Sequence, residues 1–204
     1  AKLSRLLARV NYNKTSEFRS EPYPPTQRES LDIILTNING ALTYESMLEA
    51  WMMKNIDKDI PVLKEIVGNV NELEYFGNNV LYGIGGEKVD VLLVHKRRVR
   101  YKATAIELKK GKVDDSSIEQ ISRYSYWVAQ LTTANVEPHV EELVLQPVVI
   151  GNTIEPSLVR SARRIAVREL HIPYLTAPCR VQVMPPLLTR YYVRDERMNF
   201  EILT

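Results

Sequence analysis

The sequence has little of what disulfide scaffolds and membrane spans require. Its 204 residues contain one cysteine, Cys179, which has no partner for an internal disulfide. We therefore expect a reducing, cytoplasmic environment. No apolar run approaches the roughly 20 residues of a membrane-spanning helix, so we expect no membrane partner. The three histidines are scattered without the spacing of metal ligands, which argues against a histidine-based metal centre.

A large net charge is also missing, because 27 Lys and Arg oppose 25 Asp and Glu. Hydrophobic residues make up 45% of the chain and charged residues 25%, a composition typical of a globular domain with a buried core. The charge is unevenly distributed. Residues 96–112 carry eight Lys and Arg and one acid, Glu107. That density suits a polyanionic partner, although surface hairpins are often basic for solubility alone.

The chain divides into an N-terminal extension, 1–40, and a main domain, 41–204. Within the extension, 2–10 has helical spacing, the proline-rich stretch 21–25 is expected to be an extended connector, and 32–37 has the pattern of a strand. We expect the extension to serve as a dimerisation or substrate arm.

The main domain alternates helical and strand patterns. Thr43 is a suitable N-cap for a first helix, and Ser116-x-x-Glu119 forms a capping box for a later one. The order of elements predicts an α/β fold with a central mixed β-sheet flanked by helices. We expect helices from Thr43 onward and over 61–68, 116–131 and 157–169. We expect strands over 72–76, 80–84, 89–94, 101–109, 143–150, 180–184 and 190–193, with turns at Asn78–Asn79, at Gly85–Gly86 and in the basic segment before 101.

Two acidic residues and a lysine fall on neighbouring predicted strands. Glu107 and Lys109 are two residues apart, so their side chains lie on the same face of a strand. Asp90 interrupts the apolar run VDVLLV, where an ionised carboxylate costs desolvation unless a cation compensates. With backbone oxygen and water, Asp90 and Glu107 form the hard-oxygen set that suits Mg²⁺ or Mn²⁺. The simpler interpretation is a surface ion pair between Glu107 and Lys109, with Asp90 merely beginning its strand.

Polar residues on two predicted helices favour a shared site. Glu45 lies at the edge of the apolar stripe of the first helix, so it is the carboxylate expected to point toward the site. Glu49 is expected further round, toward solvent. Gln120 and Tyr124 are one turn apart on the same face of the 116–131 helix. Their simpler roles are a solvated polar residue for Gln120 and core packing for Tyr124.

Together these motifs resemble those of the PD-(D/E)XK nuclease superfamily. The resemblance covers about 43–175 and rests on Gly85-Gly86-x-x-x-Asp90, Ala105-Ile106-Glu107-Leu108-Lys109-Lys110-Gly111 and Gln120-x-x-Arg123-Tyr124. The series is most similar to the archaeal NucS-type endonuclease branch, which the upstream Glu45-x-x-Leu48-Glu49 motif also matches. Val89 stands where a proline usually precedes the Asp, and residues 1–40 do not resemble the NucS N-terminal domain. The small size and the N-terminal stretch also resemble nuclease-like proteins of archaeal spindle-shaped viruses, for which the compartment would be the host cytoplasm.

The resemblance implies a restriction-endonuclease-like core and metal-dependent hydrolysis of DNA phosphodiester bonds, on branched or single-stranded DNA. It implies a homodimer, because many relatives pair two sites. The implied catalytic residues are Asp90, Glu107, Lys109, Gln120 and Glu45. The implied ligands of Mg²⁺ or Mn²⁺ are Asp90, Glu107 and the carbonyl oxygen of Leu108.

Basic residues would then follow the phosphates of the DNA without reading its sequence. The expected nucleic-acid-binding residues are Arg97, Arg98, Arg100, Lys110, Lys112, Arg123, Tyr124, Arg160 and Arg164. For the two arginines after Pro156, a solvated helix face or a subunit contact is an equal alternative. For the whole chain, the alternatives are a non-catalytic nucleic-acid-binding or assembly protein on a nuclease fold, and a plain α/β scaffold protein.

Overall fold

The computed structural model describes residues 42–82, 87–135, 140–172, 179–194 and 197–204. The predicted extension, 1–40, and the predicted Gly85–Gly86 turn lie outside these ranges and stay predictions.

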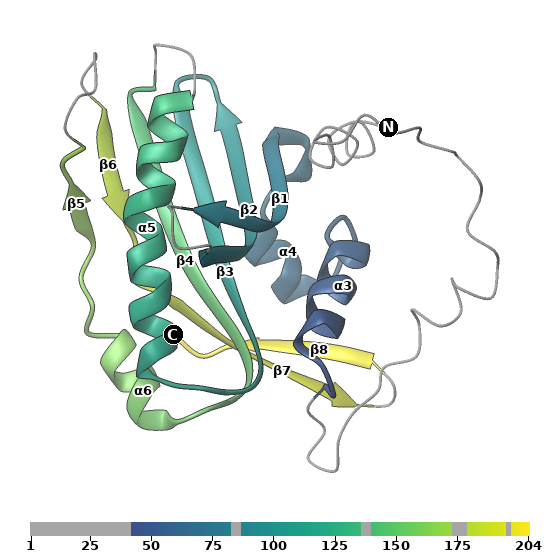
Figure 1. The fold of residues 1–204 in the computed structure, drawn as a ribbon. Coiled ribbons are helices and arrows are strands. Elements are labelled where there is room, and N and C mark those ends of the chain that lie inside the picture. Colours follow the sequence, from purple (N-terminus) through teal and green to yellow (C-terminus); the bar gives the residue numbers. More distant parts are fainter. Residues whose placement is uncertain (1–41, 83–86, 136–139, 173–178, 195–196) are drawn as a thin grey trace, which may run out of the picture.

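The described residues alternate between helices and strands along the chain (Figure 1). The helices are α3 (Glu45–Asn55), α4 (Pro61–Val67), α5 (Asp115–Asn135) and α6 (Pro156–Ala162), with a 3-10 turn, η1 (Val70–Glu72). The strands are β1 (Leu73–Tyr82), β2 (Glu87–Arg97), β3 (Arg100–Val113), β4 (Glu142–Ile154), β5 (Arg168–Leu170), β6 (Arg180–Val183), β7 (Leu187–Arg194) and β8 (Arg197–Ile202). In the part of the chain described, none of the helices combines the length and the apolar character needed to cross a bilayer.

The strands form one mixed sheet in the order β1-β2-β3-β4-β6-β5, with β7 and β8 attached beside the second half of β4. The first three strands are antiparallel neighbours. Strand β4 runs parallel to β3, β6 and β7. The predicted α/β fold with a central mixed sheet flanked by helices is therefore confirmed.

Helices cover both faces of this sheet, and each face has its own apolar core. Helix α5 lies across one face (Figure 1), where Ile121 and Val128 pack among sheet residues that include Ala103 and Ala105. Helices α3 and α4 supply the other core, which includes Ile106 and Leu108 of β3. Successive side chains of a strand point to opposite faces. Glu107, between Ile106 and Leu108, is therefore directed toward the α5 side of the sheet.

The prediction of two strands separated by a turn at Asn78–Asn79 is wrong. Strand β1 continues through these residues, and its pairing with β2 keeps one register from Asn78↔Val91 to Val80↔Val89. Asn79 adopts a positive φ of 49°, a conformation that Asn tolerates better than most residues. The Asn pair thus produces a local kink rather than a chain reversal.

The predicted N-caps of the first helix and of α5 are also wrong. Helix α3 begins at Glu45, after Tyr44, which makes no side-chain capping hydrogen bond. Helix α5 begins at Asp115, one residue before the predicted start. An Asp114 carboxylate oxygen accepts hydrogen bonds from the Ser117 amide at 3.1 Å and the Ser116 hydroxyl at 2.6 Å. Asp114 therefore caps α5 in place of the predicted Ser116–Glu119 box.

The helix predicted over 157–169 is shorter than expected. Helix α6 ends at Ala162, and Arg168 already belongs to strand β5, where it pairs with Val183 of β6. Antiparallel pairing with β6 places Arg168 in a strand, although the spacing of the arginines is that of a helix. Arg160 and Arg164 consequently do not share one helix face.

Strand β3 carries a one-residue bulge beside β4. Lys109 pairs with Gly151, but Lys112 pairs with Thr153, so β3 has one residue more than β4 between these two pairs. Gly151 is buried against this bulge. A Cβ atom at position 151 would overlap the Val113 side chain and would lie 3.1 Å from the Gly111 carbonyl oxygen. The absence of a side chain at Gly151 is what lets β4 approach the bulge.

We expect Gly151→Ala to destabilise the protein by about 1–3 kcal/mol. The added methyl group would overlap the Val113 side chain and the backbone of the bulge. Gly111→Ala is the matched control, since a Cβ atom there meets nothing within 4 Å. Urea unfolding of both variants measures the difference. Equal stability of the two would contradict the close approach of β4 to the bulge.

Candidate functional site

Asp90 and Glu107 lie close together where the pairing of β2 with β3 ends. The antiparallel pairing of β2 and β3 ends at Val91 and Ile106, and Asp90 and Glu107 are the next residue on each strand. The Asp90 carboxylate binds the Leu108 amide, and its charge acts on Glu107. The structure therefore brings together the two carboxylates that the sequence predicted as partners.

Asp90 is half-buried and tied to the neighbouring strand. One carboxylate oxygen accepts a hydrogen bond from the Leu108 amide at 2.7 Å. Burial raises the pKa of Asp90 to about 6, against the lowering effect of this hydrogen bond. The nearby charges of Glu45 and Glu49 raise it further, and that of Lys109 opposes them. Asp90 thus occupies a place where negative charge is costly unless a cation is present.

Glu107 is the more deeply buried of the two, with 2% of its surface exposed. One carboxylate oxygen accepts a hydrogen bond from the Lys109 ammonium at 2.6 Å. The other oxygen is buried and has no hydrogen-bond partner among the described residues. Burial and then the charge of Asp90 raise the pKa of Glu107 to about 7, although Lys109 lowers it. A buried carboxylate oxygen without a partner costs free energy, and a positive ligand would offset that cost.

Lys109 is the positive member of the cluster. Burial by itself lowers the pKa of this ammonium, but the hydrogen bond and charge of Glu107, followed by the charges of Glu45 and Asp90, raise it overall. Lys109 is therefore a fixed cation at neutral pH. The surface ion pair that the sequence left open is excluded, because Glu107 is buried and β3 lies between β2 and β4 inside the sheet.

Glu45 reaches this end of β3 from the first turn of α3. It is exposed, and its carboxylate accepts a hydrogen bond from the Lys110 amide at 3.2 Å. Its charge also influences Asp90, Glu107 and Lys109. The prediction that Glu45 points toward the shared site is consistent with this placement.

Glu49 was expected to point toward solvent, and the structure corrects this. One of its carboxylate oxygens accepts hydrogen bonds from the side-chain amides of Asn78, at 2.7 Å, and Asn79. Glu49 thereby fastens α3 to the kink in β1, next to the strand that carries Asp90. The sequence signal was the Asn-Asn pair, which a turn explained equally well.

Gln120 and Tyr124 lie together on α5, as predicted. The Gln120 side-chain amide donates a hydrogen bond to the Tyr124 hydroxyl. Tyr124 is 1% exposed and belongs to the core on the α5 side. Its side chain therefore cannot reach a phosphate directly, and the role left to it is to support Gln120.

The basic hairpin turn lies far from the carboxylates. Arg97 and Arg100 form the last pair before the turn, and Glu107 follows Arg100 by seven residues on the same strand. At about 3.3 Å per residue, the separation is about 23 Å. Arg97, Arg98 and Arg100 are exposed there. Any phosphate that they contact is several nucleotides away from one bound at Glu107.

The other predicted nucleic-acid-binding residues lie on β3, on α5, and within or just after α6. Lys110 and Arg123 are exposed on β3 and α5, and Arg160 and Arg164 are exposed within and just after α6. Lys112 makes a 2.5 Å ion pair with Glu155, which offsets its charge for a phosphate.

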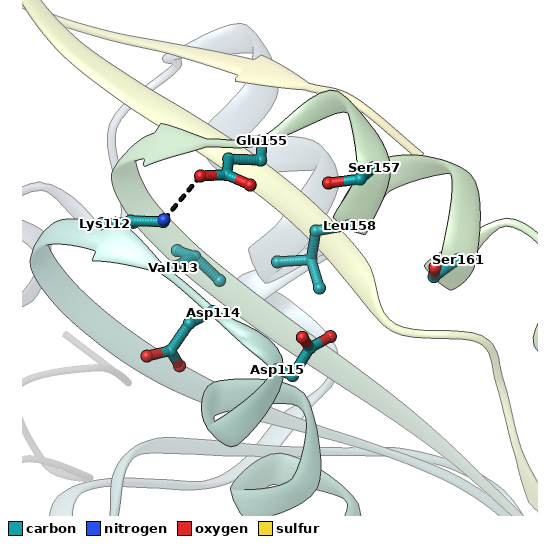
Figure 2. A pocket seen from close by; sticks show the side chains of 8 residues that line it. All are labelled: Lys112, Val113, Asp114, Asp115, Glu155, Ser157, Leu158 and Ser161. Atoms are coloured by element: carbon teal, nitrogen blue, oxygen red, sulfur yellow. Dashed lines mark ion pairs between the residues drawn. The ribbon is translucent and has the colours of Figure 1, made fainter.

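A pocket of about 160 Å³ lies next to this ion pair, between the end of β3, the start of α5 and α6. Figure 2 shows the Lys112–Glu155 pair together with Asp114 and Asp115 from the start of α5. Asp90, Glu107 and Lys109 do not line this pocket. Glu155 is paired with Lys112 and Asp114 caps α5, so the pocket is not an extension of the carboxylate site.

Two residues near the site were not found from the sequence. Tyr191 of β7 donates a hydrogen bond from its hydroxyl to the Lys110 carbonyl, and Gly151 of β4 accommodates the bulge after Lys109. Neither belongs to a recognisable motif. Both act through long-range strand pairing, which a single sequence does not specify.

The chemistry of the residues fits a divalent cation such as Mg²⁺. This ion is commonly held by one or two carboxylates with waters completing its shell. Asp90 and Glu107 supply two carboxylates, and one oxygen of Glu107 has no partner in the part of the chain that the structure describes. Among the described residues, no three His, Cys, Asp or Glu side chains converge into a complete metal-ligand set.

Comparison with known proteins adds no relative. The chain matches no family model, no curated protein and no solved structure. The interpretation of the site therefore rests on its own residues.

The raised pKa of Glu107 predicts a stability cost in the metal-free protein. The folded-state pKa, about 7, lies above the usual value of 4.5. The stability associated with the protonated carboxyl is therefore fully present below pH 4.5 and is lost as the pH rises through about 7. We expect Glu107→Gln to stabilise the protein at pH 8 in a chelator by on the order of 1–3 kcal/mol, with little change at pH 4.

Thermal unfolding at the two pH values measures this effect. Glu119→Gln, on the exposed side of α5, is the control and should be neutral at both. A Glu107→Gln protein less stable than the wild type at pH 8 would show that the ion pair with Lys109 outweighs the burial of the carboxylate.

Proposed function

We propose that this protein is a metal-dependent endonuclease that hydrolyses DNA phosphodiester bonds. The observation that carries the proposal is the buried Glu107 carboxylate, which lies close to Asp90, is hydrogen-bonded to Lys109 and has one oxygen without a partner among the described residues. Two desolvated acids beside one lysine suit a divalent cation and a phosphate together. The same residues carry the resemblance to the PD-(D/E)XK nucleases and to a restriction-endonuclease-like core.

In this proposal Asp90 and Glu107 hold Mg²⁺ or Mn²⁺, with the Leu108 carbonyl as a third oxygen. When bound, such a cation supplies an activated water and polarises the phosphate. The Leu108 amide keeps one oxygen of Asp90 in place. The positions of both acids are therefore fixed by strand pairing rather than by loops.

Lys109 is proposed to stabilise the negative charge that develops on the phosphate. An ammonium has three donors, and one is engaged by Glu107. The remaining donors are available for an oxygen of the substrate. Gln120, supported by Tyr124, would position water or the DNA backbone, and Glu45 would orient groups at the end of β3.

The proposed substrate is branched or single-stranded DNA, and the proposed assembly is a homodimer in the cytoplasm. Support for an extended substrate comes from the exposed arginines of the β2–β3 turn, about 23 Å from Glu107 along β3. Phosphate contacts of this kind add affinity without sequence preference.

The decisive experiment is cleavage of a panel of flap, junction, single-stranded and duplex DNA with Mg²⁺ or Mn²⁺. We expect Glu107→Ala and Lys109→Met to lower the cleavage rate at least about 100-fold, because each removes a charge needed at the reacting phosphate. Both variants should still bind DNA. Glu119→Ala is the control and should cleave at the wild-type rate.

If Glu107→Ala cuts as fast as the wild type, the site assignment is wrong. If neither the wild type nor Glu107→Ala cuts and both bind DNA, the result supports the second candidate function, a non-catalytic nucleic-acid-binding or assembly protein. The observation that favours this candidate is the direct Glu107–Lys109 ion pair, which would then be a permanent structural pair. Calorimetry with Mn²⁺ separates the two, because only the nuclease requires the cation.

The turn arginines make a separate prediction about DNA binding. We expect the double variant Arg97→Gln and Arg98→Gln to weaken binding uniformly across DNA sequences. The slope of log K against log salt should fall by about 1.5–2, since two phosphate contacts are lost. Arg180→Gln is the control, because Arg180 is paired with Glu169 at 2.6 Å. An unchanged slope would exclude the turn from the DNA-binding surface.

A further inference from the structure

The bulge in β3 follows directly after Lys109. Lys109 still pairs with Gly151, and regular pairing resumes at Lys112 with Thr153. Lys110 and Gly111 therefore form the irregular segment. Bulges redirect the side chains of a strand and are common beside active sites. A change in this segment would move Lys109, because Lys109 and Lys110 are joined by a peptide bond.

Both polar groups of the Lys110 backbone are held by side chains from other elements. Its amide donates to Glu45 of α3 at 3.2 Å, and its carbonyl accepts from the Tyr191 hydroxyl of β7. Tyr191 is fully buried. Its hydroxyl also accepts a hydrogen bond from the Leu42 amide at 3.2 Å. One phenol oxygen thus connects the segment before α3, the bulge and β7.

The Tyr191 hydroxyl is suited to a fixed structural contact. Burial raises its pKa, the hydrogen bond from Leu42 lowers it, and the charge of Glu45 raises it again, with a net rise above the usual value. The phenol therefore stays protonated and remains a donor to Lys110. Its ring belongs to the core on the α3 side of the sheet. Tyr191→Phe therefore keeps the packing of the ring and removes only the hydroxyl.

We propose that Tyr191 is a positioning residue, which acts through the Lys110 peptide to keep Lys109 aligned with Glu107. This inference rests on the proposed nuclease function for its kinetic consequence. Glu45 holds the amide side of the same peptide, and Gly151 provides the space on the β4 side. Of the three contacts, the hydroxyl of Tyr191 is the one that lies outside the cluster of charges and can be removed alone.

Tyr191→Phe tests the proposal, with Tyr192→Phe as the matched control on the same strand. The ring of Tyr192 is exposed and lies beside Arg190. Three properties are measured: the exchange of the Lys110 and Gly111 amides in the metal-free protein, the affinity for Mn²⁺, and kcat and KM for a cleaved DNA. Tyr191→Phe should speed amide exchange about 10-fold or more. It should lower kcat about 10–100-fold while KM changes less than about threefold, because small displacements at a reacting centre are costly.

Each outcome has a distinct meaning. Wild-type amide exchange in Tyr191→Phe overturns the proposal, because the hydroxyl then does not hold the bulge. Faster exchange with unchanged kcat and Mn²⁺ affinity also overturns it, because the role is then structural only. If the wild type itself neither cuts DNA nor binds Mn²⁺, the proposed function fails separately. Amide exchange then still decides whether Tyr191 fixes the segment next to Lys109.

A second variant keeps the test open if Tyr191→Phe does not fold. Glu45→Ala removes the other holder of the Lys110 peptide from the exposed surface of α3, where a truncation is tolerated. Exchange of the Lys110 amide should accelerate about 10-fold or more in this variant. The Gly111 amide should keep its wild-type rate in Glu45→Ala, because Tyr191 still holds the Lys110 carbonyl. A Gly111 amide that exchanged about 10-fold faster would show that Tyr191 does not fix the segment, which overturns the proposal.

Discussion

The structure around the end of β3 depends on two neighbouring carboxylates, buried Glu107 and half-buried Asp90, and on the ammonium of Lys109 that binds Glu107. Burial raises the pKa of Asp90 to about 6 and that of Glu107 to about 7. An apolar core would not retain such a pair for stability, since buried ions repay their desolvation only with good partners. The surrounding structure supplies part of the compensation through Lys109 and the Leu108 amide. The second oxygen of Glu107 receives no such compensation from the described residues.

The rest of the fold holds these groups from several directions. Strand β3 is paired on both sides, by β2 and by β4. Helix α3 is fastened to β1 through Glu49 and to the bulge through Glu45. Helix α5 places Gln120 over the core on the face to which Glu107 is directed. The site is therefore built on regular elements, which position side chains more accurately than loops do.

Much of this arrangement could be predicted because it depends on local periodicity. The alternation around Glu107 and Lys109 placed both on one face of a strand, and the basic turn between two apolar runs marked the β2–β3 hairpin. The α/β class followed from the order of the elements. Asp90 could be chosen because a lone acid in an apolar run needs a partner. These inferences use neighbours within a few residues.

What could not be predicted depends on contacts between distant segments. Asn78 and Asn79 have turn chemistry, but pairing with β2 keeps them in a strand. The arginine spacing after Pro156 is helical, yet β6 recruits Arg168 into the sheet. Tyr191 reaches Lys110 across 81 positions of the chain. No pattern in one sequence reports such a contact, because its partner is chosen by the topology of the sheet.

The placement of Asp90 and Glu107 just past the last pair of the β2–β3 hairpin has an evolutionary consequence. Their relation follows from the pairing of Val91 with Ile106, whereas the number of residues between them is set by the length of the hairpin. Equal insertions on both strands would lengthen the hairpin and leave the two acids at the same end of it. Distant homologues can therefore share this site while differing in the interval between its acids. A search for them should compare cross-strand pairing rather than motif spacing.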